Sequence, residues 1–197
     1  MGTPGSDPGP VARFDDLRAG DSFVLRDQFV ARAVSEVADV VALLDSADEQ
    51  ARAGLWVAVV LTYEAGAAFD VAFPRRPLAP GLPLAWMAAF RSREQVPPLT
   101  PAPGPSVVDV RRRGGSEWFR HGVTTCRDLI AQGLTYQINL TDRFDGRLVR
   151  SPFDLYRSMA TAQAGAFNAC IDLGDHVVVS APPEPFLHLD GTGSRHD

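Results

Sequence analysis

The chain has 197 residues, of which 45% are hydrophobic and 22% charged, and these values are typical of a soluble globular protein with a substantial core. Its formal net charge of −5 argues against a nucleic-acid-binding surface, which usually carries a basic patch. No apolar stretch approaches the ~20 residues that a membrane-spanning helix needs. All 19 basic side chains are arginine, and the 2 cysteines match no metal or redox spacing. We therefore expect a cytoplasmic protein with reduced thiols that binds neither nucleic acid nor membrane.

The first quarter of the chain shows strand and then helix signals. Residues 1–12 are rich in glycine, proline and serine and are expected to form a disordered tail. Polar and apolar residues alternate from Phe14 to Ala33, which predicts one or two short strands, and Asp15–Asp16 is expected in a solvated loop. Ser35 is a candidate N-cap for a helix that stops at Gly54. The apolar face of this helix is expected to comprise Val37, Val40, Val41 and Leu44.

The next segment contains two apolar runs and a linker. Leu55–Leu61 is continuously apolar and predicts a central strand buried on both faces, and Leu84–Phe90 predicts a further strand. Val96–Pro105 holds five prolines and a glycine, which exclude it from a sheet interior because proline lacks the amide donor. The basic run Arg111–Arg113 next to it is interpreted as solvated, so that 96–115 form a linker.

A helix and a strand are predicted after this linker. Ser116 is a candidate N-cap and Gly133 a C-terminal stop for the helix. Its expected apolar face comprises Phe119, Val123, Cys126, Leu129 and Ile130. Thr135–Phe144 alternates cleanly between polar and apolar residues, which predicts an amphipathic strand.

The last segment begins with Ser151 and Pro152, a cap-plus-N1 pair that predicts a helix with Phe153, Tyr156 and Met159 on its apolar face. Gly174–Asp175 lies between two apolar runs and predicts a β-hairpin. Asp190–Gly191 is a second hairpin turn, but Thr192–Asp197 contains no apolar residue. We therefore expect this second hairpin to lack its partner strand.

Two segments of the chain carry a family resemblance. Thr135–Thr141 (Thr-Tyr-Gln-Ile-Asn-Leu-Thr) follows a helix and a glycine, and it resembles the entry to the chorismate-binding domain of chorismate-using enzymes. Ser180–Leu187 (Ser-Ala-Pro-Pro-Glu-Pro-Phe-Leu) is similar to the Ser-x-Ser-Pro-Glu-x-Phe-Leu segment of that family. Upstream, Gly54–Ala58, Thr62–Ala65 and Leu82–Trp86 are similar to aminodeoxychorismate synthase component I, in the same order.

This resemblance implies an α+β fold with antiparallel β-sheets flanked by helices. It implies amination of chorismate to 4-amino-4-deoxychorismate, for 4-aminobenzoate and folate synthesis, with ammonia from a separate glutaminase subunit. Glu184 matches the catalytic glutamate of the family, which handles protons. The family also uses a downstream lysine nucleophile and carboxylate-bound Mg²⁺, and this lysine-free chain has no counterpart for the nucleophile. The Mg²⁺ ligands are likewise expected to be absent from this chain.

The same resemblance predicts an incomplete chorismate-utilising fold. We expect a tail over 1–12, an N-terminal region over 13–95, the linker over 96–115, the first part of a chorismate-binding domain over 116–191, and a tail unrelated to the family over 192–197. The chain is thus interpreted as an N-terminal fragment that is inactive on its own and prone to aggregate through an exposed sheet edge.

Two alternatives remain open from the residues. One is an enzyme of the anthranilate synthase component I type. That branch usually carries Leu-Leu-Glu-Ser and Asn-Pro-x-Pro-Tyr-Met segments that help bind tryptophan, and Gln163–Phe167, at the second position, lacks both prolines. The other is a non-catalytic module that docks a glutaminase or binds a small effector.

Overall fold

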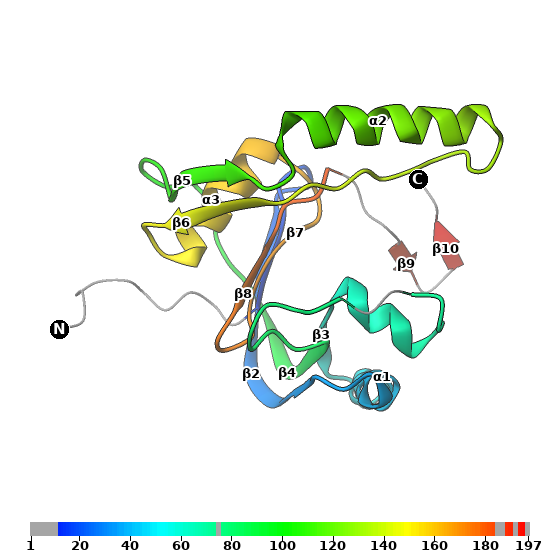
Figure 1. Ribbon diagram of the computed structural model, residues 1–197. Helices are drawn as coiled ribbons and strands as arrows, with labels where there is room; N and C mark the ends of the chain where they lie inside the picture. Colours follow the sequence, from blue (N-terminus) through cyan, green and yellow to red (C-terminus); the bar gives the residue numbers. More distant parts are fainter. Residues whose placement is uncertain (1–11, 74–75, 184–187, 191–192, 196–197) are drawn as a thin grey trace. The chain divides into compact units, whose positions relative to one another are not determined.

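Six antiparallel strands form the main sheet, in the order β3-β4-β2-β1-β7-β8 (Figure 1). The computed structural model describes residues 12–73, 76–183, 188–190 and 193–195. The strands of this sheet are β1 (Ala12–Asp16), β2 (Asp21–Val34), β3 (Trp56–Leu61), β4 (Ala85–Gln95), β7 (Asn168–Asp172) and β8 (Val177–Ser180). Two segments that are far apart in sequence therefore lie side by side, because β1 pairs with both β2 and β7.

The sheet is strongly curled, since both of its outer strands contribute to one apolar cluster. Ala58 and Val60 of β3 and Val178 of β8 pack on the same group of side chains as Trp86 and Phe90 of the inner strand β4. A β-bulge in the 14-residue strand β2 helps the bend, because the pairing with β4 shifts between Gln28 and Val30. The curled inner face thus buries its own core, and the members of that cluster all come from strands or the turn after β7.

The other face of the sheet is covered by helices. Helix α1 (Val40–Arg52) follows the short 3₁₀ helix η1 (Val37–Asp39), and with η2 (Tyr63–Ala68) it packs on Ala85 and Met87 of β4. Helix α3 (Pro152–Gln163) packs on Cys170 of β7 through Tyr156 and Ala160. Alternate residues of β4 therefore face opposite layers, as the two-residue period of a strand requires.

Several predictions from the sequence are confirmed. The strands predicted over Phe14–Ala33 are β1 and β2, and the turn between them contains Gly20, whose positive φ of 72° favours glycine. The Gly174–Asp175 hairpin joins β7 and β8, with the amide of Leu173 donating to the carbonyl of His176 at 2.8 Å. The α+β class with antiparallel sheets flanked by helices is also confirmed.

The prediction of a central strand over Leu55–Leu61 is wrong. Strand β3 pairs with β4 and, within the described residues, lies at the edge of the sheet. Trp56 is 47% exposed and Leu61 46% exposed. An uninterrupted apolar run in the sequence does not show whether the strand has a neighbouring strand on both sides or on one side only.

The predicted serine caps Ser35 and Ser116 are also wrong, whereas α3 begins at Pro152, directly after the third predicted cap Ser151. The N-cap residues are Glu36 for η1, Asp39 for α1 and Gly114 for α2, and none of them makes a side-chain cap hydrogen bond. Helix α1 begins later than expected because the 3₁₀ turn precedes it. Its buried face is Val40, Leu43 and Ala47, whereas Val41 is 43% exposed.

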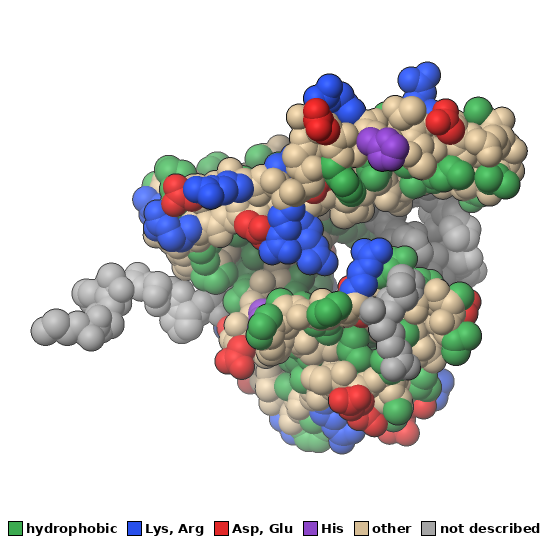
Figure 2. All heavy atoms as spheres, viewed as in Figure 1, with side chains coloured by type: hydrophobic (Ala, Val, Ile, Leu, Met, Phe, Trp, Pro, Cys, Tyr) green, Lys and Arg blue, Asp and Glu red, His purple; other side chains and the backbone are tan. Residues whose placement is uncertain are grey.

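Residues 103–151 form a separate compact unit, and residues 12–102 and the described part of 152–197 form the other. The smaller unit contains β5 (Val107–Arg112), α2 (Gly115–Ala131) and β6 (Phe144–Leu148), with β5 antiparallel to β6. Helix α2 has no buried residue in the described part of the chain, and Figure 2 shows hydrophobic side chains on its surface. The predicted apolar face of α2 is therefore not buried.

Two predictions fail in this smaller unit. Arg111 and Arg112 are not in a solvated linker but in β5, where Arg112 pairs with Asp142, and Arg113 after the strand pairs with Asp145. The predicted strand Thr135–Phe144 is not formed over 135–143, and only the later segment β6 is a strand. Side-chain alternation is not sufficient for a strand, because a ladder also needs a partner backbone.

The chain end differs from the expectation as well. His188–Asp190 (β9) and Gly193–Arg195 (β10) pair as a two-stranded sheet, so the second hairpin has a partner strand despite its polar sequence. The predicted boundaries between an N-terminal region, a linker and a chorismate-binding domain stay a prediction. Among the described residues, no helix has the length and apolar character needed to cross a bilayer.

Candidate functional site

A buried ion pair lies in the centre of the main sheet. Asp15, expected in a solvated loop, is instead the fourth residue of β1 and is 1% exposed. The Arg13 guanidinium donates two hydrogen bonds to its carboxylate, each 2.9 Å long. The hydroxyl of Tyr156 on α3 donates a further bond of 2.5 Å to Asp15 Oδ2. The carboxylate therefore joins the sheet to the helix, as a buried charge requires well-placed donors.

Arg13 also fixes the proline-rich segment that follows β4. Its Nη2 donates to the carbonyl of Pro97 at 2.8 Å, and its guanidinium lies 5.7 Å from the centre of the Phe153 ring. Farther along, Arg157 on α3 donates to the carbonyls of Thr100 (2.7 Å) and Pro101 (3.0 Å). A segment that cannot join a sheet through its own amides is thus held by arginine side chains.

Burial shifts two pKa values near this ion pair. Burial is the main reason that the pKa of Tyr156 lies well above its usual value, and the hydrogen bond to Asp15 raises this pKa further. Burial also raises the pKa of Cys170 to about 11, with the charge of Asp172 as the next cause. The Cys170 thiol is therefore protonated and unreactive at neutral pH, whereas Cys126 is a half-buried free thiol.

Asn168 joins the same region from β7. It is 1% exposed, and its Nδ2 donates to the carbonyls of Asp15 (3.0 Å) and Gly165 (2.7 Å). Its Oδ1 has no hydrogen-bond partner among the described residues, and neither has the buried hydroxyl of Ser22, which lies opposite Asp15 on β2. The carboxylate thus lies between two buried polar residues on the neighbouring strands.

The loop after α3 approaches the second family motif. A Cβ atom added to Gly165 would lie 2.8 Å from the carbonyl oxygen of Pro182, a distance that real Cβ atoms do not adopt. Ala164, just before it, has a φ of 51°. Proline fixes φ near −65°, so a proline at this position would be incompatible with the observed loop.

The predicted catalytic residue Glu184 lies outside the described residues, and so does the Pro185–Leu187 part of its motif. The described part of that motif, Ser180–Pro183, begins at the end of β8. The other motif, Thr135–Thr141, lies in the smaller unit, and its Tyr136 is 92% exposed. The described parts of the two motifs thus belong to different units.

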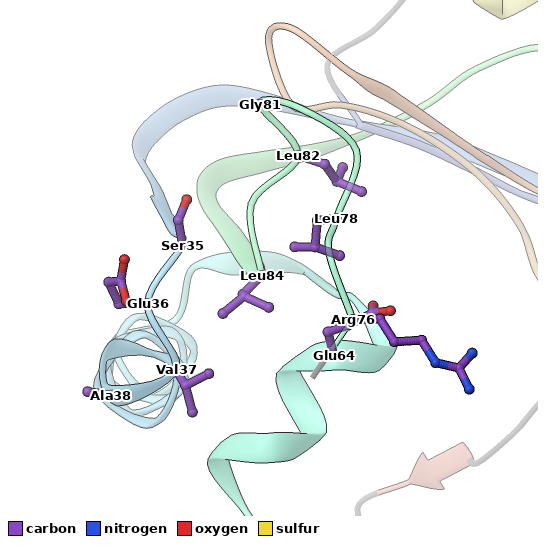
Figure 3. Close-up of a pocket in the computed structure, with 10 residues that line it drawn as sticks. All are labelled: Ser35, Glu36, Val37, Ala38, Glu64, Arg76, Leu78, Gly81, Leu82 and Leu84. Atoms are coloured by element: carbon purple, nitrogen blue, oxygen red, sulfur yellow. The ribbon is translucent and has the colours of Figure 1, made fainter. Parts of the chain in front are cut away.

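A cavity of about 730 Å³ lies elsewhere in the larger unit (Figure 3). Its apolar lining includes Leu78, Leu82 and Leu84, and its charged lining comprises Glu36, Glu64 and Arg76. Neither carboxylate has a hydrogen-bond or ion-pair partner among the described residues. Cavities of this size hold small organic molecules.

The described residues do not fit a Mg²⁺ site. No group of three or more histidine, cysteine, aspartate or glutamate side chains is placed to hold a metal ion in the part of the chain that the structure describes. The buried Asp15 is already occupied by Arg13 and Tyr156. No chemical step of this chain is therefore derived through the metal.

The sequence contained one usable signal for the buried ion pair. Arg13 and Asp15 are two residues apart, so they lie on the same face of a strand, where opposite charges can pair. Tyr156 and Asn168 could not have been assigned to the same region, because their positions follow from the pairing of β1 with β7 and the packing of α3.

Comparisons with known proteins place the sequence in a family. The sequence pattern of the family described as chorismate binding enzyme matches residues 12–195. Aminodeoxychorismate synthase of Streptomyces griseus is 28% identical over 115 residues, which are 55% of this chain and 16% of that protein. Aminodeoxychorismate synthase of Streptomyces pristinaespiralis is 33% identical over 101 residues, covering 49% of this chain and 14% of that protein.

A third relative belongs to another branch. Anthranilate synthase component 1 of Thermus thermophilus is 35% identical over 75 residues, which are 38% of this chain and 16% of that protein. The matched region thus spans about a sixth of the length of these curated relatives. No solved structure matches the chain. The family match extends from β1 to β10, and the chain belongs to the chorismate binding enzyme family.

Proposed function

We propose that this chain provides part of an aminodeoxychorismate synthase component I, which converts chorismate and ammonia to 4-amino-4-deoxychorismate. The observation that carries the proposal is the family match over residues 12–195, combined with similarity to two aminodeoxychorismate synthases. Chorismate is then the substrate, and a glutaminase subunit is the proposed source of ammonia. The product would serve 4-aminobenzoate and folate synthesis.

The loop after α3 favours this branch over a tryptophan-regulated anthranilate synthase. The tryptophan-binding segment of that branch carries prolines where this chain has Gln163–Phe167. The φ of 51° at Ala164 is one that proline cannot adopt. We therefore expect calorimetry to show no binding of L-tryptophan by the purified chain. Saturable binding at micromolar tryptophan would favour the anthranilate branch instead.

Glu184 is the proposed general acid or base, by its place in the Ser180–Leu187 motif. A carboxylate can transfer a proton near neutral pH when its surroundings raise its pKa. Arginine cannot supply the nucleophilic amine of the family, because its guanidinium stays protonated. We therefore expect no 4-amino-4-deoxychorismate from the purified 197-residue chain with chorismate, ammonium and Mg²⁺.

A chimera tests the role of Glu184. Residues 12–190 of this chain, joined to the downstream part of the Streptomyces griseus enzyme, should produce 4-amino-4-deoxychorismate from chorismate and ammonium. Glu184→Gln should lower kcat by about 10²–10⁴-fold, the contribution typical of a general acid or base. Glu117→Gln, in the first turn of α2, is the matched control and should leave kcat unchanged. An active Glu184→Gln chimera would contradict the assignment.

The alternative of an effector-binding module rests on the cavity beside η1 and η2. Two carboxylates, Glu36 and Glu64, line it against one cation, Arg76, and this acidic balance with the leucine lining suits an organic cation with an apolar body (Figure 3). Binding of phenethylamine, lost in Glu64→Gln but retained in Glu117→Gln, would support this alternative. Equal binding of phenylacetate would contradict it, because an anion should be repelled by the two carboxylates.

A further inference from the structure

Residues 96–102 form a strap that leads from the end of β4 to a contact with α3. Every third residue of the strap is half-buried, namely Val96, Leu99 and Ala102. The residues between them are exposed, namely Pro97, Pro98, Thr100 and Pro101. This spacing fits a polyproline II helix, which has about three residues per turn and no internal hydrogen bonds. The strap therefore needs partners outside itself.

Arginine side chains supply most of the hydrogen bonds that hold the strap. Among the described residues, the strap donates one backbone–backbone hydrogen bond, from the amide of Val96 to the carbonyl of Ser22 at 2.9 Å. At its other end, Arg157 on α3 donates to the Thr100 carbonyl at 2.7 Å, to the Thr100 hydroxyl at 2.8 Å and to the Pro101 carbonyl at 3.0 Å. These three bonds are exposed, so water can take their place when they break.

The inner side of the strap faces the buried ion pair. Arg13 Nη2, which donates to Asp15 Oδ1, also donates to the Pro97 carbonyl at 2.8 Å. Leu99 packs on the cluster of buried residues that contains Cys170. Cys170 is the direct partner of Arg13 in the pairing of β7 with β1, so both side chains lie on one face of the sheet. The strap therefore covers this face beside the Arg13 guanidinium.

The contacts of the strap lie outside the strand pairing of the main sheet, in which β4 ends at Gln95. Strands β1, β2 and β7 pair through their own backbones, and Arg13 keeps both bonds to Asp15 when the strap leaves. Release therefore costs the arginine bonds, the Val96 bond and the burial of Leu99, but not the packing of the sheet. Segments with few buried apolar contacts and exposed hydrogen bonds open at a lower free energy than the core does.

We propose that the strap is a releasable cover, which opens as a local unit while the main sheet stays folded and thereby admits solvent to the Arg13–Asp15 ion pair. The strap also leads directly into the smaller unit, which begins at Pro103, so its release frees a longer connection to that unit. The opening is independent of the proposed function, because neither chorismate nor Glu184 takes part in it.

Solvent exchange of the Arg13 Nε–H tests the proposal, measured by NMR on the 197-residue chain labelled with ¹⁵N-arginine. Arg13 is 8% exposed, and its Nε donates to Asp15 Oδ2 at 2.9 Å, so the closed strap should slow this exchange. Opening of the strap exposes little surface, and the exchange rate should therefore depend only weakly on urea at low concentration. Exchange through global unfolding would instead rise steeply with urea from zero onward, and that result would overturn the proposal.

Two strap variants should accelerate this exchange. Arg157→Gln removes the bonds from α3 and should raise the exchange rate of the Arg13 Nε–H at low urea by about tenfold, the factor expected for the net loss of about one hydrogen bond. Leu99→Ala removes the packed side chain of the strap and should act in the same direction. Arg26→Gln is the matched control, because Arg26 donates from an exposed position to Glu94 and should leave the rate unchanged. An effect of Arg157→Gln no larger than that of Arg26→Gln would contradict the proposal.

A core variant separates release of the strap from a general loss of stability. Leu43→Ala on α1, at a 3% exposed position in another apolar cluster, should lower the urea midpoint of unfolding. Opening of the strap does not involve this cluster, so exchange of the Arg13 Nε–H at low urea should stay unchanged. If Leu43→Ala accelerates that exchange as strongly as Arg157→Gln does, the ion pair is exposed only by general unfolding, and the strap is not a local unit.

Discussion

Removal of the Tyr156 hydroxyl is the sharpest test of the buried ion pair. Tyr156→Phe leaves the aromatic ring in its packed position and removes the 2.5 Å hydrogen bond to Asp15. A hydrogen bond to a charged group contributes about 1.5–3 kcal/mol to the free energy of unfolding. Asp15 keeps both bonds from Arg13, so the substitution leaves no unpaired charge that would add to the loss.

We therefore expect Tyr156→Phe to lower the free energy of unfolding by about 1.5–3 kcal/mol. For a chain of this size, that corresponds to a fall in Tm of roughly 3–12 °C. Urea unfolding followed by circular dichroism measures the first quantity and a thermal scan the second. Both should be read at pH 7, where the raised pKa of Tyr156 keeps its hydroxyl protonated.

Tyr136→Phe is the matched control, because the Tyr136 side chain is 92% exposed and its hydroxyl is hydrated. Its free energy of unfolding should stay within about 0.5 kcal/mol of the parent. If Tyr156→Phe is no more destabilising than Tyr136→Phe, the bond to Asp15 contributes nothing, and the account of the buried network is wrong.

Three further outcomes follow from the same core. Burial raises the pKa of Cys170 to about 11, so the folded chain holds this proton more tightly than the unfolded chain does. The contribution of Cys170 to the free energy of unfolding should therefore be fully present below about pH 9 and be lost as the pH rises through 11. Cys170→Ala should flatten that loss in urea titrations. Ellman's reagent should modify Cys126 in the native chain but reach Cys170 only in denaturant, and rapid labelling of both thiols would refute its burial. Phe90→Ala, at a 1% exposed position of the curled inner face, should cost about 3–5 kcal/mol, whereas Phe69→Ala, at a 60% exposed position, should cost far less.

Local signals in the sequence identified most elements of the larger unit. Turn chemistry at Gly174–Asp175 identified the β7–β8 hairpin, since only a few residue types tolerate a positive φ. The 3.6-residue period identified all three α-helices. The two family motifs also identified the chorismate binding enzyme family, which the match over residues 12–195 confirmed.

Local sequence patterns did not predict the N-caps of η1, α1 and α2 or the partners of the strands. Serine at a helix start is a preference of about 1 kcal/mol, which the 3₁₀ turn before α1 overrides. An alternating run such as Thr135–Phe144 becomes a strand only if another backbone pairs with it, and the described residues form no strand over 135–143. Likewise, the apolar run of β3 does not reveal whether one or two strands flank it.

The amino-acid sequence by itself thus determined the three α-helices, the β7–β8 hairpin and the family. Only the tertiary structure decided that Asp15 is buried, since a carboxylate next to another carboxylate normally lies in solvent. Its burial depends on donors from Arg13, two residues away, and from Tyr156, 141 residues away. Charge compensation over such a separation is set by which strands and helices pack together, and no local pattern encodes it.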